Sequence, residues 1–181
     1  MPFRYTIICL LFSAILSAQG RIRLRDAQNH ATNLSKMAES RLVVVVMLAA
    51  TCPISQGQSA EIDSLVRLFP EVCVIGVLTK WENAATCDTF GQQFRPKYHL
   101  VRDPRGKLTH RLGATITPEA FVLAPNLRDI VYQGALNDNY VSLGNRRREV
   151  TSHYLRDAIA AALRHEKPNP AKTTPIGCLI D

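Results

Sequence analysis

The sequence predicts one α/β domain in which helices flank a central mixed β-sheet. Two β-branched apolar runs, Leu42–Leu48 and Val72–Leu78, are typical of strands that are buried on both faces. Between them, residues 55–69 carry apolar side chains at helical spacing. Strand and helix patterns that alternate in this way favour a parallel core with right-handed crossovers. A hairpin pattern over residues 120–133 then makes the sheet mixed.

The other elements are expected in chain order on either side of this core. A short hairpin within residues 22–34 and a helical turn capped by Ser35 precede the first buried strand. Thr151 or Ser152 is the expected cap of a last helix that ends near Arg164. The pattern also predicts helices at 83–94 and 107–112, a strand at 100–101, and hairpin strands at 120–123 and 129–133.

The composition suits a single globular core. The chain has 181 residues, of which 46% are hydrophobic and 20% charged. It has enough apolar surface to bury, which excludes a disordered chain. The net charge of +7 is not gathered into a long basic stripe, so we expect no nucleic-acid partner. The run Arg146–Arg148 is followed directly by Glu149, and we interpret it as a solvated loop.

Residues 1–20 have the pattern of a secretory signal peptide. Arg4 is followed by the apolar run Tyr5–Ala18 and then by small residues. The run spans about 14 residues, whereas a membrane-crossing helix needs about 20. We therefore expect export to the periplasm or the extracellular space, with no stable membrane insertion after cleavage. The predicted organisation is a signal peptide at 1–20, a domain at 21–166 and an irregular tail at 167–181.

Four of the five cysteines belong to the expected mature chain, because Cys9 leaves with the signal peptide. Export brings them to a compartment that tolerates disulfides. They form no CxxC pair and no histidine pair accompanies them, so we expect neither a metal nor another cofactor. Three complete pairings are possible, and the sequence does not select among them. The four residues are Cys52, Cys73, Cys87 and Cys178.

Cys52 is the candidate reactive residue. It follows the first buried strand and precedes the first long helix, where open α/β sheets present their ligands. The dipole and unpaired N–H groups of a helix N-terminus favour the thiolate and so lower the pKa of the thiol. Pro53 suits the first helical position. A thiolate attacks disulfides and peroxides. The alternative is a small buried apolar residue without reactivity.

Two motifs together resemble the active site of the thioredoxin-like superfamily. The first is C-P-I-S at residues 52–55, and the second is T-P-E-A-F-V-L at 117–123. The extra strand and helix pattern between 79 and 101, and the Gly-Cys-Leu-Ile ending at 177–180, are similar to exported, peroxiredoxin-related redoxins of the AhpC/TSA type. The resemblance spans roughly residues 22–181. It implies a thioredoxin-like fold with a peroxiredoxin-like strand–helix insertion.

The resemblance also implies roles for individual residues. Cys52 matches the nucleophile of the family, and Pro118 matches a proline that follows a cis peptide bond. In the family, the residue before that proline, here Thr117, contacts the substrate backbone. On the same basis, the expected substrate contacts are Thr51, Pro53, Ser55, Thr117 and Pro118.

The sequence departs from both families that it resembles. Ser55 stands where dithiol members carry their second cysteine, and Thr51 replaces their tryptophan. Val45 and Ala49 occupy the proline and threonine positions of the peroxiredoxin pattern. A single thiolate forms a mixed disulfide but needs another thiol to complete a dithiol reduction.

Two cysteines are candidates for the second thiol. Cys87 is expected on a helix, and Cys178 lies in a tail that could fold back. Cys73 lies within an apolar strand and is expected to serve packing only. A small thiol or a partner protein is the remaining possibility.

Three functions remain open at this point. The first is an exported thiol-disulfide oxidoreductase that uses the Cys52 thiolate. The second is a thiol peroxidase in which Cys87 or Cys178 resolves the oxidised Cys52. The third is a redoxin-fold binding module without catalysis. The expected partners are a disulfide-bearing protein, a small thiol or a peroxide, with a possible upstream reductant protein.

Overall fold

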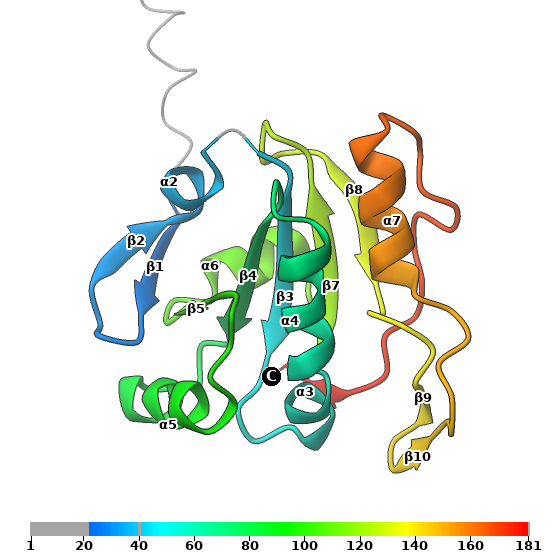
Figure 1. Ribbon diagram of the computed structural model, residues 1–181. Coiled ribbons are helices and arrows are strands. Elements are labelled where there is room, and N and C mark those ends of the chain that lie inside the picture. Colours follow the sequence, from blue (N-terminus) through cyan, green and yellow to red (C-terminus); the bar gives the residue numbers. More distant parts are fainter. Residues whose placement is uncertain (1–21, 40, 181) are drawn as a thin grey trace, which may run out of the picture.

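A seven-stranded mixed sheet forms the centre of the computed structural model, which describes residues 22–39 and 41–180 (Figure 1). The three neighbouring strands at the centre of the sheet run parallel to one another, and all other neighbouring strands are antiparallel. The predicted mixed sheet with flanking helices is therefore confirmed. In spatial order, the strands are β2 (Ala31–Asn33), β1 (Arg23–Asp26), β5 (His99–Arg102), β4 (Cys73–Leu78), β3 (Val43–Leu48), β7 (Glu119–Leu123) and β8 (Ile130–Gly134).

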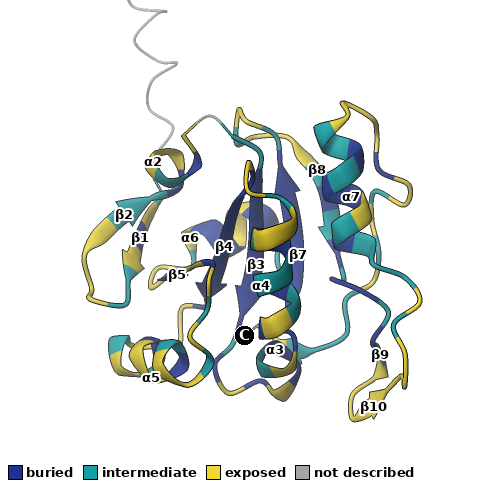
Figure 2. Cartoon of the chain, viewed as in Figure 1, coloured by how far each residue is buried: buried dark blue, intermediate teal, exposed yellow. Residues whose placement is uncertain are grey.

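The apolar run of β3 is continuous because helices cover both faces of the sheet. Val44 and Val46 pack into one cluster, and Val43 and Val45 pack into the other. All residues of β3 and β4 are buried (Figure 2). The first face carries α4 (Ser59–Leu68), α5 (Ala84–Phe94) and α7 (Tyr154–Leu163), and the second carries α2 (Leu34–Ala38) and α6 (Lys107–Leu112).

The predicted helix at 55–69 is two helices, α3 (Pro53–Gly57) and α4, which meet at Gln58. The Gln58 backbone lies at φ −94° and ψ −3°, off the ideal helical values. Its buried amide side chain donates to the Asn137 side chain at 3.0 Å. Because Asn137 is distant in sequence, the helical pattern over residues 55–69 did not indicate that the helix is interrupted at Gln58.

Two predicted helix caps are wrong. Asn33, rather than Ser35, accepts the N–H of Lys36 at the start of α2. The last helix begins at Tyr154 without a side-chain cap. The N–H groups of Thr151 and Ser152 instead donate to the Asp138 carboxylate at 2.9 and 3.0 Å. Thr151 and Ser152 thus contact Asp138, which is distant in sequence, and neither caps the helix.

Four short strands were not predicted from the sequence. β9 (Tyr140–Ser142) and β10 (Asn145–Arg146) form a hairpin that contains the start of the arginine run. β6 (Ile116–Thr117) pairs with β11 (Cys178–Leu179), so the expected irregular tail contains a strand. The predicted signal peptide lies outside the described residues. Within the described part of the chain, no helix is long and apolar enough to cross a membrane.

Gly76 in β4 is required for the packing of the first face. A Cβ on Gly76 would overlap the ring edge of Tyr98 and lie 2.9 Å from Leu48 Cδ1. Burial raises the pKa of Tyr98 to about 12, and its hydroxyl lies 3.1 Å from Ser59 Oγ. The Ser59 contact holds the Tyr98 ring, and Leu48 is fully buried, so neither neighbour has free space into which it can move.

We expect Gly76→Ala to lower the free energy of unfolding by about 1–3 kcal/mol, because the added methyl overpacks the core. Gly91→Ala in α5 is the matched control, since its nearest neighbour would be 3.8 Å away. Alanine is the better helix former, so the control should gain about 0.5–1 kcal/mol. Urea denaturation of both variants measures the difference, and equal midpoints would contradict this account.

Candidate active site

Cys52 lies where the sequence predicts it, in the loop between β3 and the helices. It is the N-cap residue of α3, with Pro53 in the first helical turn. Its N–H donates to Ala49 O at 3.1 Å, and its own carbonyl accepts the N–H of Gln56 at 3.0 Å. The side chain is only 2% exposed. This low exposure arises because the tail of the chain covers the sulfur.

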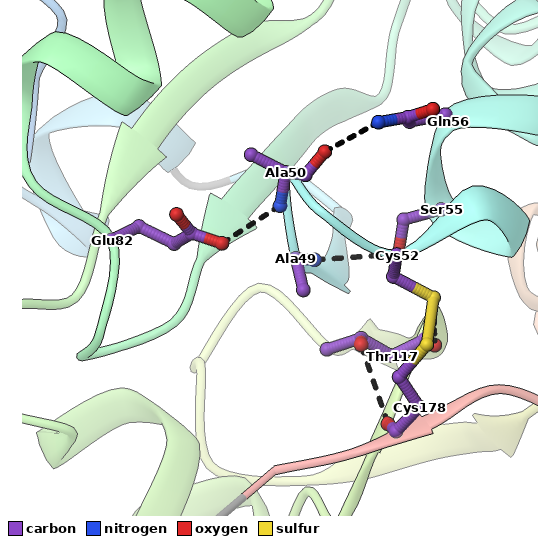
Figure 3. Close-up of a disulfide and its surroundings, with 8 residues drawn as sticks. All are labelled: Ala49, Ala50, Cys52, Ser55, Gln56, Glu82, Thr117 and Cys178. Atoms are coloured by element: carbon purple, nitrogen blue, oxygen red, sulfur yellow. Dashed lines mark hydrogen bonds between the residues drawn. A yellow bond between two sulfur atoms is a disulfide. The ribbon is translucent and has the colours of Figure 1, made fainter.

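A disulfide joins Cys52 to Cys178, which lies 126 residues further along the chain (Figure 3). The two Cα atoms are 6.2 Å apart, within the usual range for a disulfide. Of the two candidate partners, the structure brings Cys178 to Cys52 and leaves Cys87 free and buried. The bond connects the C-terminal tail to the loop that follows the carboxyl end of β3.

The second motif holds the tail in register. The peptide bond between Thr117 and Pro118 is cis, as the resemblance implies. β11 lies antiparallel to β6 with Cys178 opposite Thr117, and the Thr117 hydroxyl donates to Cys178 O at 3.3 Å. Cys52 Sγ is 3.3 Å from Thr117 O. A disulfide sulfur has no proton, so this contact becomes a hydrogen bond only in the thiol form.

The five expected substrate contacts are not equally accessible. Thr51 and Pro53 are exposed beside the disulfide. Ser55 is fully buried, and its hydroxyl accepts the N–H of Ala49 at 3.3 Å (Figure 3). Ser55 therefore supports the loop before Cys52, and its side chain is not accessible from the surface. Thr117 and Pro118 are buried beneath the tail.

Two side chains that sequence reasoning missed hold the loop before Cys52. Ala50 N–H donates to Glu82 Oε1 at 2.8 Å, and Gln56 Nε2 donates to Ala50 O at 2.7 Å (Figure 3). Glu82 follows β4 at the carboxyl edge of the sheet, as Cys52 follows β3. Because β3 and β4 are parallel neighbours, residues that follow them lie close together, and this position could have indicated that Glu82 contacts the loop before Cys52.

The tail is anchored a second time, upstream of Cys178. Thr173 N–H donates to Gln133 O at 3.0 Å, and Gln133 N–H donates to Ala171 O at 3.1 Å. The Thr173 hydroxyl accepts the N–H of Ala135 at 2.9 Å. Gly134 permits this approach, because a Cβ there would overlap the Thr173 backbone. Figure 1 shows the tail passing from α7 along the edge of β8 to the active site.

A cavity of about 250 Å³ lies beside the cis-proline loop. Its walls include Ile54 from α3, Pro118, Tyr140 from β9 and Ile176 from the tail. Asp138 is on the same wall, and hydrogen bonds from the Thr151 hydroxyl and the Ser152 N–H lower its pKa to about 2. The unpredicted β9 strand thus borders the cavity beside the cis-proline loop.

Cys73 and Cys87 are packing residues in the structure. Both are free and buried, and Cys73 Sγ lies 3.3 Å from Met37 O. Burial raises the pKa of both thiols, while Arg41 opposes the shift at Cys73 and Arg102 opposes it at Cys87. The packing role expected for Cys73 agrees with this placement.

In the reduced folded protein, we expect iodoacetamide at neutral pH to alkylate Cys52 and Cys178 at least about tenfold faster than Cys73 and Cys87. The reason is that a raised pKa leaves little thiolate and burial blocks access. Peptide mapping by mass spectrometry measures the four rates. Equal labelling of all four in urea is the control, and fast labelling of Cys87 in the folded protein would contradict the prediction.

Within residues 22–39 and 41–180, no cluster of three or more His, Cys, Asp or Glu residues is arranged to hold a metal ion. The chemistry that this arrangement supports is thiol chemistry, because Cys52 and Cys178 are within bonding distance of each other. The sheet order, the cysteine at the start of α3 and the cis Thr117–Pro118 bond define a thioredoxin-like fold. The strand–helix insertion expected from the resemblance is α5 with β5.

Comparison with solved structures agrees with this fold. An uncharacterised conserved protein from Geobacillus kaustophilus superposes with a TM-score of 0.77 at 17% identity, covering 89% of this chain and 88% of that one. A secreted Mycobacterium tuberculosis disulfide oxidoreductase homologous to Escherichia coli DsbE gives 0.58 at 13% identity, covering 78% and 96%. The Xanthomonas campestris bacterioferritin comigratory protein gives 0.56 at 19%, covering 79% and 90%. No protein-family model and no curated protein matches the sequence.

Proposed function

We propose that this chain is an exported thiol-disulfide oxidoreductase in which Cys52 is the attacking thiolate and Cys178 is the second thiol. One observation carries the proposal: Cys178 reaches Cys52 from a strand paired with Thr117, the residue before the cis bond. The tail thus supplies the second thiol, which the C-P-I-S motif lacks because Ser55 occupies that position. The secreted disulfide oxidoreductase from Mycobacterium tuberculosis shares the fold, and the pattern of residues 1–20 supports export.

The reaction balances in two thiol-disulfide exchanges. The Cys52 thiolate attacks one sulfur of the substrate disulfide, forms a mixed disulfide and releases the other sulfur as a thiolate. Cys178 loses its proton and attacks Cys52 Sγ. This step breaks the mixed disulfide, releases the second substrate thiolate and closes the Cys52–Cys178 bond. The substrate gains two electrons, and a reductant protein or small thiol later returns two electrons to the protein.

Thiol peroxidase chemistry is the alternative. The Xanthomonas campestris structure, described with alkyl peroxide reduction activity, supports it through the shared fold. In that reaction Cys52 takes an oxygen from the peroxide, and Cys178 condenses with the sulfenic acid and releases water. The surroundings of Cys52 favour disulfide exchange instead. Ala49 stands in the threonine position of peroxidases, and the Ser55 hydroxyl is held by the Ala49 N–H.

The test compares two oxidants of the reduced protein, an insulin-type protein disulfide and hydrogen peroxide. Mass mapping follows formation of the Cys52–Cys178 disulfide, with Cys52→Ser as the inactive control. We expect the protein disulfide to oxidise the pair at least about tenfold faster than it oxidises free cysteine. If hydrogen peroxide alone oxidises the pair rapidly, the protein is a peroxidase. If neither oxidant acts on Cys52, the binding-module function replaces both.

A further inference from the structure

The pairing of β11 with β6 indicates the geometry that a partner strand would adopt when it bonds to Cys52. Cys178 carries the bonded sulfur while its backbone pairs with Thr117, and Ile180 N–H donates to Thr115 O at 2.9 Å. A partner cysteine in a mixed disulfide with Cys52 meets the same edge. An extended chain gains main-chain hydrogen bonds by adding to an open strand edge. The tail is therefore a template for the partner strand.

The residue before the cysteine has no room for a side chain. A Cβ on Gly177 would overlap Thr117 O and lie 2.7 Å from Thr117 C and 3.0 Å from Ile116 Cγ2. Two of these atoms belong to the backbone of β6, next to the cis-proline loop, and cannot turn away as the end of a flexible side chain can. Gly177 is also not among the residues with positive φ. The glycine is therefore required for space and not for backbone conformation.

The flanking positions differ in what they meet. Ile176, two residues before the cysteine, lines the cavity beside Ile54 and Pro118. Leu179, directly after the cysteine, is 75% exposed. The protein surface therefore favours an apolar residue at the first of these positions and selects little at the second.

A partner strand can occupy the place of β11 only if the tail leaves β6 when the disulfide is reduced. β11 contains only two residues, and the disulfide cross-links it to Cys52. The upstream anchor at Thr173 does not depend on that bond, because it rests on hydrogen bonds to Gln133 and Ala135. For an incoming segment to reach β6, reduction must free the last part of the tail, while the tail remains attached at the edge of β8.

We propose that the reduced protein acts on partners that present an extended segment with an apolar residue, a glycine and then the disulfide-bonded cysteine. This inference rests on the proposed function, because it takes Cys52 as the attacking thiolate. Cys52 attacks the sulfur of that cysteine and releases its former partner sulfur as a thiolate. Cys178 then attacks Cys52 Sγ and releases the segment as a thiolate. The tail takes the place of the segment on β6 in the same step.

The test uses the reduced Cys178→Ser variant, which retains mixed disulfides, and two peptides in the form of disulfide-linked homodimers. One peptide is Thr-Pro-Ile-Gly-Cys-Leu-Ile, and the other has alanine in place of glycine. Stopped reactions and mass spectrometry give the rate of adduct formation at Cys52. Glutathione reacts with both peptides as the measure of their intrinsic reactivity. After that correction, we expect the glycine peptide to react at least about tenfold faster than the alanine peptide.

The outcomes separate this inference from the proposed function. If both peptides react equally fast, or if an insulin-type disulfide forms the adduct and neither peptide does, glycine selection on β6 is overturned and the proposed function stands. If no peptide and no protein disulfide forms an adduct with Cys52, the proposed function itself fails. Reduced wild-type protein serves as the second measurement, because its Cys52–Cys178 bond forms only when the exchange is complete.

The chain also allows a test without a partner. In Gly177→Ala, we expect the equilibrium constant for forming the Cys52–Cys178 disulfide against glutathione to fall at least about tenfold, because the methyl lifts the tail from β6. Gly91→Ala is the matched control, since a Cβ there meets nothing closer than 3.8 Å. An unchanged equilibrium in Gly177→Ala would overturn the steric argument.

Discussion

Replacing Cys178 with serine is expected to stop disulfide reduction after its first step. Cys52 still attacks the substrate, but the second thiol that breaks the mixed disulfide is missing. Ser55 has no thiol, and Cys87 is buried with a raised pKa, so neither replaces Cys178. We expect the turnover of an insulin-type substrate to fall by roughly two orders of magnitude while the Cys52–substrate adduct accumulates.

Non-reducing electrophoresis and mass mapping measure the adduct, and the reduction assay measures turnover. Cys87→Ala is the matched control and should keep most of the activity, since Cys87 forms no disulfide. Cys52→Ser should show neither turnover nor adduct. A Cys178→Ser variant that turns over normally would mean that an external thiol resolves Cys52 and that the tail disulfide has a structural role.

Local patterns predicted the scaffold of the site correctly. The β-branched run of β3 and the following Cys52 and Pro53 are contiguous, so their strand, loop and helix start are encoded within a few residues. The cis bond before Pro118 followed from the resemblance of a short motif. These features require no knowledge of which distant segments meet.

The cysteine pairing could not be predicted, because it depends on where the tail docks. Cys178 is brought to Cys52 by contacts at Thr173 and by close approaches at Gly134 and Gly177. Each joins segments that are distant in sequence, and no single segment signals it. The same reason explains the helix break at Gln58, whose side chain pairs with a residue far along the chain.

Reduction of the Cys52–Cys178 bond is expected to lower the free energy of unfolding by about 3–5 kcal/mol. The bond closes a loop with a sequence separation of 126, and closing so long a loop removes much of the entropy of the unfolded chain. For a domain of this size, the melting temperature should fall by roughly 10 °C. Thermal denaturation with and without reductant measures the shift.

Cys178→Ser controls for the reductant, because its melting temperature should not respond to it. Cys87→Ala should retain the full shift. If the wild-type protein melts at the same temperature in both states, strain in the folded protein offsets the loop entropy.

The stabilisation of the fold by the Cys52–Cys178 disulfide also predicts the direction of electron transfer. If the disulfide stabilises the fold, then by thermodynamic linkage the fold stabilises the disulfide by the same amount. A folded protein that favours its disulfide gives up electrons readily when reduced. The reduced protein is therefore expected to reduce its substrates, and the tail that returns to β6 makes the forward reaction more favourable. A protein in which reduction raised the melting temperature would instead act as an oxidant.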